Sequence, residues 1–206
     1  MQITALDADP RQPDRIRLEI DGVRFGTIAG EVARSENLAT GRIVDSELQE
    51  RLTRAADVEA AFRTVLRALE VRSFARGDLA RRMLRKGHQR HAIESALERA
   101  AGLGLLDDAA FARNYVQTRS ARGRGPVRLM RDLLCMGVDR PLIELAIAAE
   151  WTEDTDRTAM PLALAQKRAS QLKSLPRQTR RRRVVAYLAR RGFSGRDITD
   201  IVDQVL

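Results

Sequence analysis

The stretch Leu129-Met-Arg-Asp-Leu-Leu-Cys-Met-Gly-Val-Asp-Arg-Pro-Leu-Ile-Glu-Leu-Ala-Ile147 has a glycine near its centre and apolar residues on both sides. The same pattern returns around Gly87 and Gly192, with apolar or small residues eight, four and three positions before the glycine and six, nine and ten positions after it. Both sets of spacings are typical of one face of an α-helix. A glycine can adopt the left-handed conformation that ends a helix, so the three copies predict a repeated helix-turn-helix unit.

The recurring positions before and after the glycines are expected to lie on one face of each helix. Before the glycines they are Leu79, Met83 and Leu84, then Leu129, Leu133 and Leu134, then Val184, Leu188 and Ala189. After the glycines they are Ile93, Ala96 and Leu97, then Ile143, Ala146 and Ile147, then Ile198, Ile201 and Val202.

About fifty residues separate successive glycines, which is enough for three short helices in each unit. Aromatic residues make up only 4% of the 206-residue chain, and arginine, alanine and leucine favour helices. We therefore predict a mostly α fold with three tandem three-helix repeats in an elongated array. The expected division is 1–55 for an N-terminal extension and 56–104, 105–150 and 151–206 for the repeats.

The N-terminal extension is predicted to contain a β-hairpin. Apolar and polar residues alternate over 16–20 and again over 23–25, on either side of Asp21-Gly22. This dipeptide is a strong hairpin signal, because both turn positions need a positive φ. Residues 26–38 are ambiguous, with a short helix as one alternative.

Local signals also predict where the helices begin. Ser46 and Gln49 fit a capping box that opens a helix through about residue 55, and Asp57 is a plausible cap for the next helix. Asp107 is expected to open another helix, and Pro126 suits a first helical turn. Further helices are expected at 76–86, 89–102, 157–172, 177–191 and 195–205, and the acidic stretch 150–157 is interpreted as a linker.

The charge is strongly positive and unevenly distributed. The formal net charge is +9, and because three of the 37 cationic residues are lysines, 34 are arginines. Residues 1–55 hold eight arginines against ten acidic residues, a net of −2, so the rest of the chain carries +11. This asymmetry indicates a polyanionic partner, and nucleic acid is favoured over a membrane because no strongly amphipathic lipid-binding segment is evident.

Two groups of arginines are the candidate nucleic-acid-binding residues. The stretch 173–196 contains nine cationic residues and no acid, and mutual repulsion in such a run costs stability unless an anion is bound. A solvated surface is the alternative interpretation of each group. The first group is Arg177, Arg180, Arg181, Arg182, Arg183, Arg190 and Arg191, and the second is Arg122, Arg124 and Arg128, flanked by Arg119 and Arg131.

No motif for catalysis stands out. The sequence lacks a GxxxxGK[ST] phosphate loop, a GxSxG elbow and an HExxH motif, so we expect no enzyme activity, no cofactor and no metal site at His88 and His91. Cys135 cannot form an intramolecular disulfide and is expected to be buried and inert. No signal peptide or membrane-spanning run is evident, and we expect a cytoplasmic protein.

Five short motifs follow one another along the chain. They are 104–112 (GLLDDAAFA), 118–129 (TRSARGRGPVRL), 133–138 (LLCMGV), 187–193 (YLARRGF) and Asp197-Ile198. Together they resemble the RecX family of RecA regulators, and the resemblance covers about residues 57–206. The first repeat departs from the family pattern, because Ala75 and Asp78-Leu79 stand where a serine and a Glu-Leu pair are usual. Ser73 is then the alternative helix cap.

The resemblance implies a non-catalytic protein that binds the filament of RecA on single-stranded DNA. It further implies lower ATPase, strand-exchange and coprotease activities of that filament. Double-stranded DNA is an additional expected partner, both forms being bound without regard to sequence, and we expect a monomer that binds no membrane.

A tandem helix-turn-helix transcription regulator is the alternative function. Gly87 with Ile93 and Ala96 fits part of the repressor pattern, but Arg82 and Lys86 occupy positions where that pattern has apolar or small residues. A third class of function is an interaction scaffold that does not bind nucleic acid.

Overall fold

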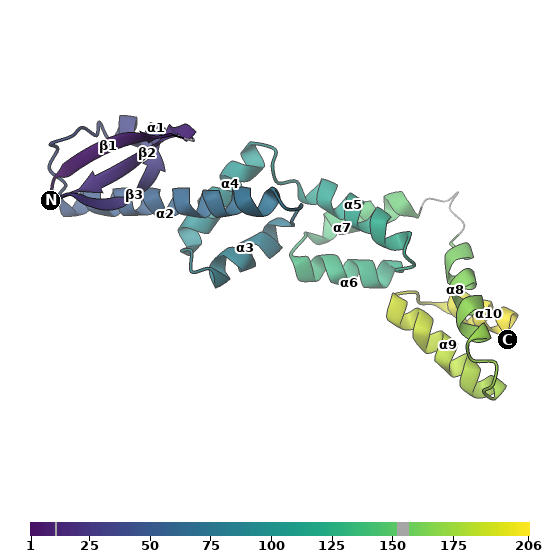
Figure 1. Cartoon of the computed structure of the whole chain (residues 1–206). Helices are drawn as coiled ribbons and strands as arrows, with labels where there is room; N and C mark the ends of the chain where they lie inside the picture. Colours follow the sequence, from purple (N-terminus) through teal and green to yellow (C-terminus); the bar gives the residue numbers. More distant parts are fainter. Residues whose placement is uncertain (11, 152–156) are drawn as a thin grey trace. The chain divides into compact units, whose positions relative to one another are not determined.

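The computed structural model describes residues 1–10, 12–151 and 157–206 (Figure 1). The chain divides into two compact units, Met1–Leu106 and Asp107–Leu206. The first unit contains a three-stranded sheet followed by four helices, and the second unit contains six helices in its described residues. The prediction of a mostly helical fold with a small N-terminal β element is therefore confirmed.

The N-terminal sheet consists of β1 (Ile3–Asp9), β2 (Gln12–Ile20) and β3 (Val23–Ala29), antiparallel in the order β1-β2-β3. The hairpin predicted around Asp21-Gly22 is confirmed, and both residues have positive φ, 49° and 76°. Strand β1 was not predicted, because its sequence ITALDAD contains few β-branched or aromatic residues. It is held by pairing with β2, and the short helix α1 (Gly30–Ser35) follows β3.

Helix α2 (Ser46–Leu69) packs against this sheet and continues into the first repeat. Leu18 and Ile28 of the sheet share a core with Leu48 and Leu52 of α2. Two helices were expected over this range, with Asp57 as the cap of the second, and this was wrong: α2 is one helix and Asp57 lies in its interior. The apolar face that meets the sheet continues directly into the face that meets α4 (Arg90–Gly102), so nothing in the packing requires a break.

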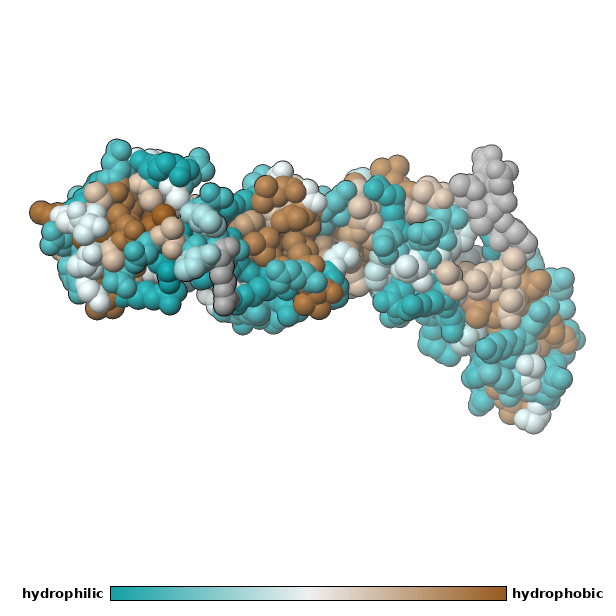
Figure 2. Space-filling view, turned by 45° about the horizontal axis from the view of Figure 1, so that its top comes forward, coloured by the Kyte–Doolittle hydropathy of each residue, from teal (hydrophilic) through white to brown (hydrophobic). Residues whose placement is uncertain are grey.

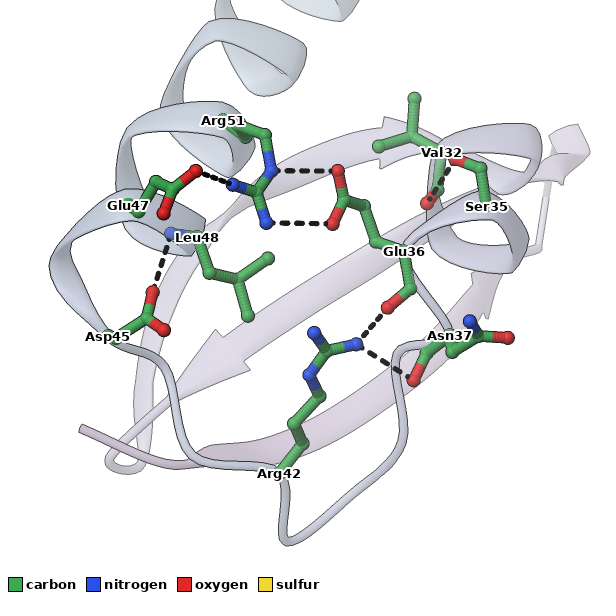
Figure 3. Close-up of polar contacts among 9 residues, drawn as sticks. All are labelled: Val32, Ser35, Glu36, Asn37, Arg42, Asp45, Glu47, Leu48 and Arg51. Atoms are coloured by element: carbon green, nitrogen blue, oxygen red, sulfur yellow. Dashed lines mark hydrogen bonds and ion pairs between the residues drawn. The ribbon is translucent and has the colours of Figure 1, made fainter.

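The N-terminal cap of α2 is Asp45 and not Ser46. The Asp45 carboxylate accepts a hydrogen bond of 2.7 Å from the Leu48 amide (Figure 3). Nearby, the Arg51 guanidinium donates two hydrogen bonds to the Glu36 carboxylate, at 2.9 and 3.1 Å, which tie the loop after α1 to α2. These bonds lower the pKa of Glu36 and raise that of Arg51.

The first repeat is formed by α2, α3 (Arg76–Arg85) and α4. The N-cap of α3 is Ala75, which has no side chain that can cap, so the expectation for Ser73 was wrong. Glu59 of α2 is 1% exposed and pairs with both Arg15 of β2 and Arg99 of α4. This ion cluster joins the sheet to the first repeat.

The second unit contains α5 (Asp108–Ser120), α6 (Pro126–Met136), α7 (Arg140–Glu150), α8 (Ala159–Ser170), α9 (Arg177–Arg191) and α10 (Arg196–Val205). As predicted, the Asp107 carboxylate caps α5, at 2.8 Å from the Ala110 amide, and Pro126 occupies the first turn of α6. Most of the predicted acidic linker, residues 152–156, lies outside the described residues.

The three repeat glycines adopt the left-handed conformation that was predicted, with φ of 86° at Gly87, 82° at Gly137 and 94° at Gly192. The positions eight and four residues before each glycine are buried. The position three residues before it was expected on the same face, but Leu84, Leu134 and Ala189 are exposed. At 3.6 residues per turn this position lies about 140° away from the position eight before the glycine.

Cys135 is exposed, so the expectation that it is buried was wrong. It lies beside Leu134 on the part of α6 that turns away from Leu129 and Leu133. Both units have a largely hydrophilic surface that is interrupted by hydrophobic patches (Figure 2).

Candidate nucleic-acid interface

Six arginines of the second unit line one hollow of about 370 Å³. They come from the end of α5, from the loop before α6, from the first turn of α6 and from the end of α9. The structure therefore brings together residues from both predicted groups. The lining residues are Arg119, Arg122, Arg124, Arg128, Arg190 and Arg191.

The two sides of the hollow meet through their backbones. The Gly125 amide donates to the Arg191 carbonyl at 2.8 Å, and the Val127 amide donates to the Gly192 carbonyl at 3.2 Å. The Arg191 guanidinium also donates to the carbonyls of Arg122 and Gly123, at 3.0 and 3.2 Å. The end of α9 is thus attached directly to the loop that begins α6.

This backbone junction requires glycine at two positions. A Cβ atom on Gly125 would lie 2.4 Å from the Gly192 carbonyl oxygen, and one on Gly192 would lie 2.3 Å from the Cβ of Arg128. Both distances are far inside van der Waals contact. Gly192 thus both ends α9 and lets two repeats approach closely.

Two residues that sequence reasoning missed orient the arginines. The Asp132 carboxylate, 14% exposed, accepts hydrogen bonds from Arg124 at 2.6 Å and from Arg128 at 2.9 Å. The Tyr115 hydroxyl accepts from Arg124 at 3.0 Å and donates to Asp132 at 3.3 Å. Burial, assisted by Asp132, raises the pKa of Tyr115, so its proton is retained.

The spacing of four between Arg128 and Asp132 was a usable signal for this contact, because residues four apart are neighbours on a helix. Aromatic rings support two further arginines: Arg119 lies 5.4 Å from the ring centre of Tyr115, and Arg191 lies 5.0 Å from that of Tyr187. Such cation–π contacts restrict the side chains while their N–H groups remain able to donate.

The amino-terminal arginines of α9 do not line this hollow. Arg181 makes a two-bond contact with Asp203 of α10, at 2.6 and 3.0 Å, which raises the pKa of Arg181 and lowers that of Asp203. Arg181 and Arg182 line a separate concave surface along α9. The other amino-terminal arginines of α9 are Arg177 and Arg183, which are exposed, and Arg180, which is half-buried.

Across the residues that the structure describes, no three His, Cys, Asp or Glu side chains come together to hold a metal ion. His88 instead contacts the Thr64 hydroxyl, at 2.9 Å from Nε2, and burial lowers its pKa. None of the described helices is long and apolar enough to cross a membrane.

Two family models match the second unit: RecX, second three-helix domain, over 107–147, and RecX, third three-helix domain, over 162–202. The chain is also 35% identical over 151 residues to the Regulatory protein RecX of Streptomyces coelicolor, covering 72% of this chain and 79% of the relative. The chain belongs to the RecX family. The resemblance found in its motifs is thereby confirmed.

Other RecX proteins and RecX structures agree with this assignment. The Regulatory protein RecX of Chlorobium phaeobacteroides is 31% identical over 150 residues, covering 72% of this chain and 95% of the relative. One crystal structure of regulatory protein RecX is similar in fold with a TM-score of 0.78, at 21% identity over 99% of this chain and 98% of that one. RecX from Lactobacillus salivarius matches 72% of this chain and 96% of its own, with a TM-score of 0.62 at 20% identity.

Proposed function

We propose that this RecX-family chain is a non-catalytic regulator that binds the RecA filament on single-stranded DNA and inhibits its ATPase, strand-exchange and coprotease activities. The observation that carries this proposal is the hollow where arginines of two repeats converge. Among the described residues the hollow is lined by six guanidinium groups and no acid. Guanidinium groups match phosphate oxygens in geometry and bind them without regard to base sequence.

The contacts within the hollow support phosphate as the ligand. Asp132 engages one NH group of Arg124 and the Nε of Arg128, and each guanidinium offers five N–H donors. Donors therefore remain for an incoming anion. Arg122 and Arg190 are exposed and add charge at the rim. We propose these six residues as the main phosphate contacts, with the amino-terminal arginines of α9 as an extension of the basic surface.

In the second unit, the helices that would read bases in a helix-turn-helix protein, α7 and α10, are poorly suited to the task. The exposed positions of α10 include Asp200, which repels phosphate, and Asp203, which is paired with Arg181. Those of α7 include Arg140, which pairs with Glu144 at 3.5 Å, and the apolar Leu145. Specific contacts to base edges come mainly from arginine, lysine, asparagine and glutamine. This composition favours phosphate binding over sequence reading.

The proposal is tested by the ATPase rate of RecA on single-stranded DNA with substoichiometric amounts of this protein. Inhibition is expected from the natural chain, and weaker inhibition from the double variant Arg122→Gln with Arg190→Gln. Arg54→Gln with Arg90→Gln is the matched control, since it removes the same charge from exposed positions of the first unit, outside the proposed binding surface.

Each outcome addresses a separate part of the proposal. A natural chain without effect on the ATPase rate would contradict the filament function, and tight binding to one duplex sequence would then favour the transcription regulator. Equal inhibition by the natural chain and the Arg122/Arg190 variant would contradict the assignment of the hollow while leaving the filament function intact.

A further inference from the structure

A second concave surface of the second unit is apolar. It has a volume of about 410 Å³ and is lined by residues of α6, α7, α8 and α10. Its main apolar lining residues are Val127, Met130, Ile147, Trp151, Ile198 and Ile201. A cavity of about 150 Å³ is enough to hold benzene, so this cleft has room for a large aliphatic or aromatic side chain.

The cleft adjoins the arginine hollow. Pro126, Val127 and Gly192 line the cleft, and their immediate neighbours in the chain, including Arg128 and Arg191, line the hollow. The backbone junction between the two repeats thus forms a wall that both surfaces share. A ligand that enters the cleft has a strongly positive surface next to it.

The charged residues that line the cleft do not neutralise the positive charge of the adjoining hollow. Glu144 pairs with Arg140 at 3.5 Å. Arg157 is exposed and donates to the Trp151 carbonyl at 3.0 Å, which places a further cation at the edge of the cleft. Charge complementarity therefore selects an anionic ligand that carries an apolar group.

The lining favours an amino-acid side chain over a nucleobase as the apolar group. Most of the walls are aliphatic. Of the two aromatic lining residues, Phe193 is only 8% exposed, so Trp151 is the one ring with exposed surface for stacking. A base placed between aliphatic walls would leave ring nitrogens and exocyclic groups without hydrogen-bond partners, which is costly. An aliphatic or phenyl side chain has no such groups.

We propose that the cleft binds a bulky apolar side chain of an acidic peptide segment of a partner protein, while the carboxylates of that segment contact the adjoining arginines. This goes beyond the proposed function, because it concerns a protein-docking site that can be occupied in the absence of DNA or RecA.

Trp151 provides the measurement, because it is the one tryptophan in the sequence and lines the cleft. The probes are two short peptides of Asp and Glu, identical except for a central Phe in one and Ala in the other. The Phe peptide is expected to shift the Trp151 emission to shorter wavelength and to bind at least about tenfold more tightly than the Ala peptide, from the apolar area that it buries.

Two variants locate the binding. Val127 is 56% exposed, so Val127→Asp should fold normally, and it is expected to abolish the preference for Phe by placing a carboxylate at the cleft. Ala148→Phe fills the cleft from an exposed position without a change of charge and should have the same effect. Leu145→Asp is the matched control, because Leu145 is 69% exposed on α7 and does not line the cleft.

Equal affinity for the Phe and Ala peptides would overturn the proposal. So would a short oligothymidylate that shifts the Trp151 emission in the natural chain but not in Val127→Asp, since the cleft would then bind a nucleobase. Neither result depends on RecA, so each is distinguishable from failure of the filament assay.

Discussion

Glu59 in the first unit and Asp132 in the second are both carboxylates that contact two arginines beside an aromatic ring. Glu59 is 1% exposed, and one of its partners, Arg15, has a side chain that is only 7% exposed. Asp132 is 14% exposed, and its partners Arg124 and Arg128 have side chains that are 34% and 39% exposed. Arg99, the other partner of Glu59, has a side chain that is 42% exposed. The first cluster is thus sealed from solvent at Arg15 and Glu59, whereas both arginines of the second cluster remain open to solvent.

The difference separates a structural role from a binding role. Burial lowers the pKa of Arg15 while Glu59 opposes that shift, as expected for a guanidinium that is withdrawn from water and depends on its partner. Around Asp132 the arginines keep contact with solvent, so the carboxylate can orient them without using all their donors. A sealed ion cluster joins elements of the fold, whereas an open one presents cations to a ligand.

The largest expected effect comes from Glu59→Gln. Removal of this charge deprives the buried Arg15 guanidinium of the carboxylate that it contacts, so the first unit should lose about 3–5 kcal/mol of its free energy of unfolding. Urea unfolding followed by circular dichroism measures this loss.

Asp132→Asn is the matched change in the second unit and should cost less, about 1–3 kcal/mol, because its arginines remain solvated. Trp151 fluorescence follows the unfolding of this unit. A greater loss for Asp132→Asn than for Glu59→Gln would break the distinction between the sealed and the open cluster.

The repeat glycines extend the comparison. Gly87 and Gly192 have nearly the same φ, but a Cβ on Gly87 would meet nothing within 4 Å, whereas one on Gly192 would collide with Arg128. Gly192→Ala should therefore destabilise the second unit by about 2–4 kcal/mol, from backbone strain together with overpacking.

Gly87→Ala should cost about 1 kcal/mol from strain alone. Urea unfolding of the two variants, side by side, separates the two contributions. Equal losses of unfolding free energy in the two variants would mean that the close approach of the repeats at Gly192 does not contribute to the cost of the substitution.

The salt dependence of single-stranded DNA binding tests the open cluster directly. With log K plotted against log salt concentration, Arg122→Gln combined with Arg190→Gln should make the slope shallower by about 1.4, from two lost phosphate contacts on a single strand. Arg54→Gln with Arg90→Gln removes two exposed arginines of the first unit and should leave the slope unchanged. A similar change in both variants would assign binding to overall charge and not to the hollow.

The smallest expected effect is a pH dependence confined to the first unit, which holds both histidines, His88 and His91. The pKa of His88 is lowered mainly by burial, so below about pH 6.5 the unfolded state binds a proton before the folded state does. Stability should therefore decline as the pH falls through this range. His88→Gln should reduce the decline, measured as the urea midpoint between pH 7.5 and pH 5, whereas His91→Gln at an exposed position should not.

Much of the secondary structure was predictable because its signals are local. The cap at Asp107, the proline of α6 and the turn glycines act within a few residues, and their predicted roles were confirmed. Strand β1 was missed because its pairing with β2, and not its own sequence, holds it in place. Leu134 and Cys135 were misplaced because an apolar composition does not say which helical face meets the core.

The candidate site was predicted in its members but not in its assembly. Arg122, Arg124, Arg128, Arg190 and Arg191 were singled out from charge alone, together with five arginines of α9 that do not line the hollow. Nothing in the linear pattern indicated that the two groups meet. Tyr115 and Asp132 were missed, because an orienting residue is recognised only by what it contacts.

The sequence by itself determined most of the helices, the glycines at which three of them end, the excess of arginine and the membership of the RecX family, because each of these depends on local spacing or composition. Only the tertiary structure decided which arginines share a surface. That surface depends on the contact between the backbones at Gly125 and Gly192, residues that are far apart in the chain. The same contact makes the wall that separates the basic hollow from the apolar cleft.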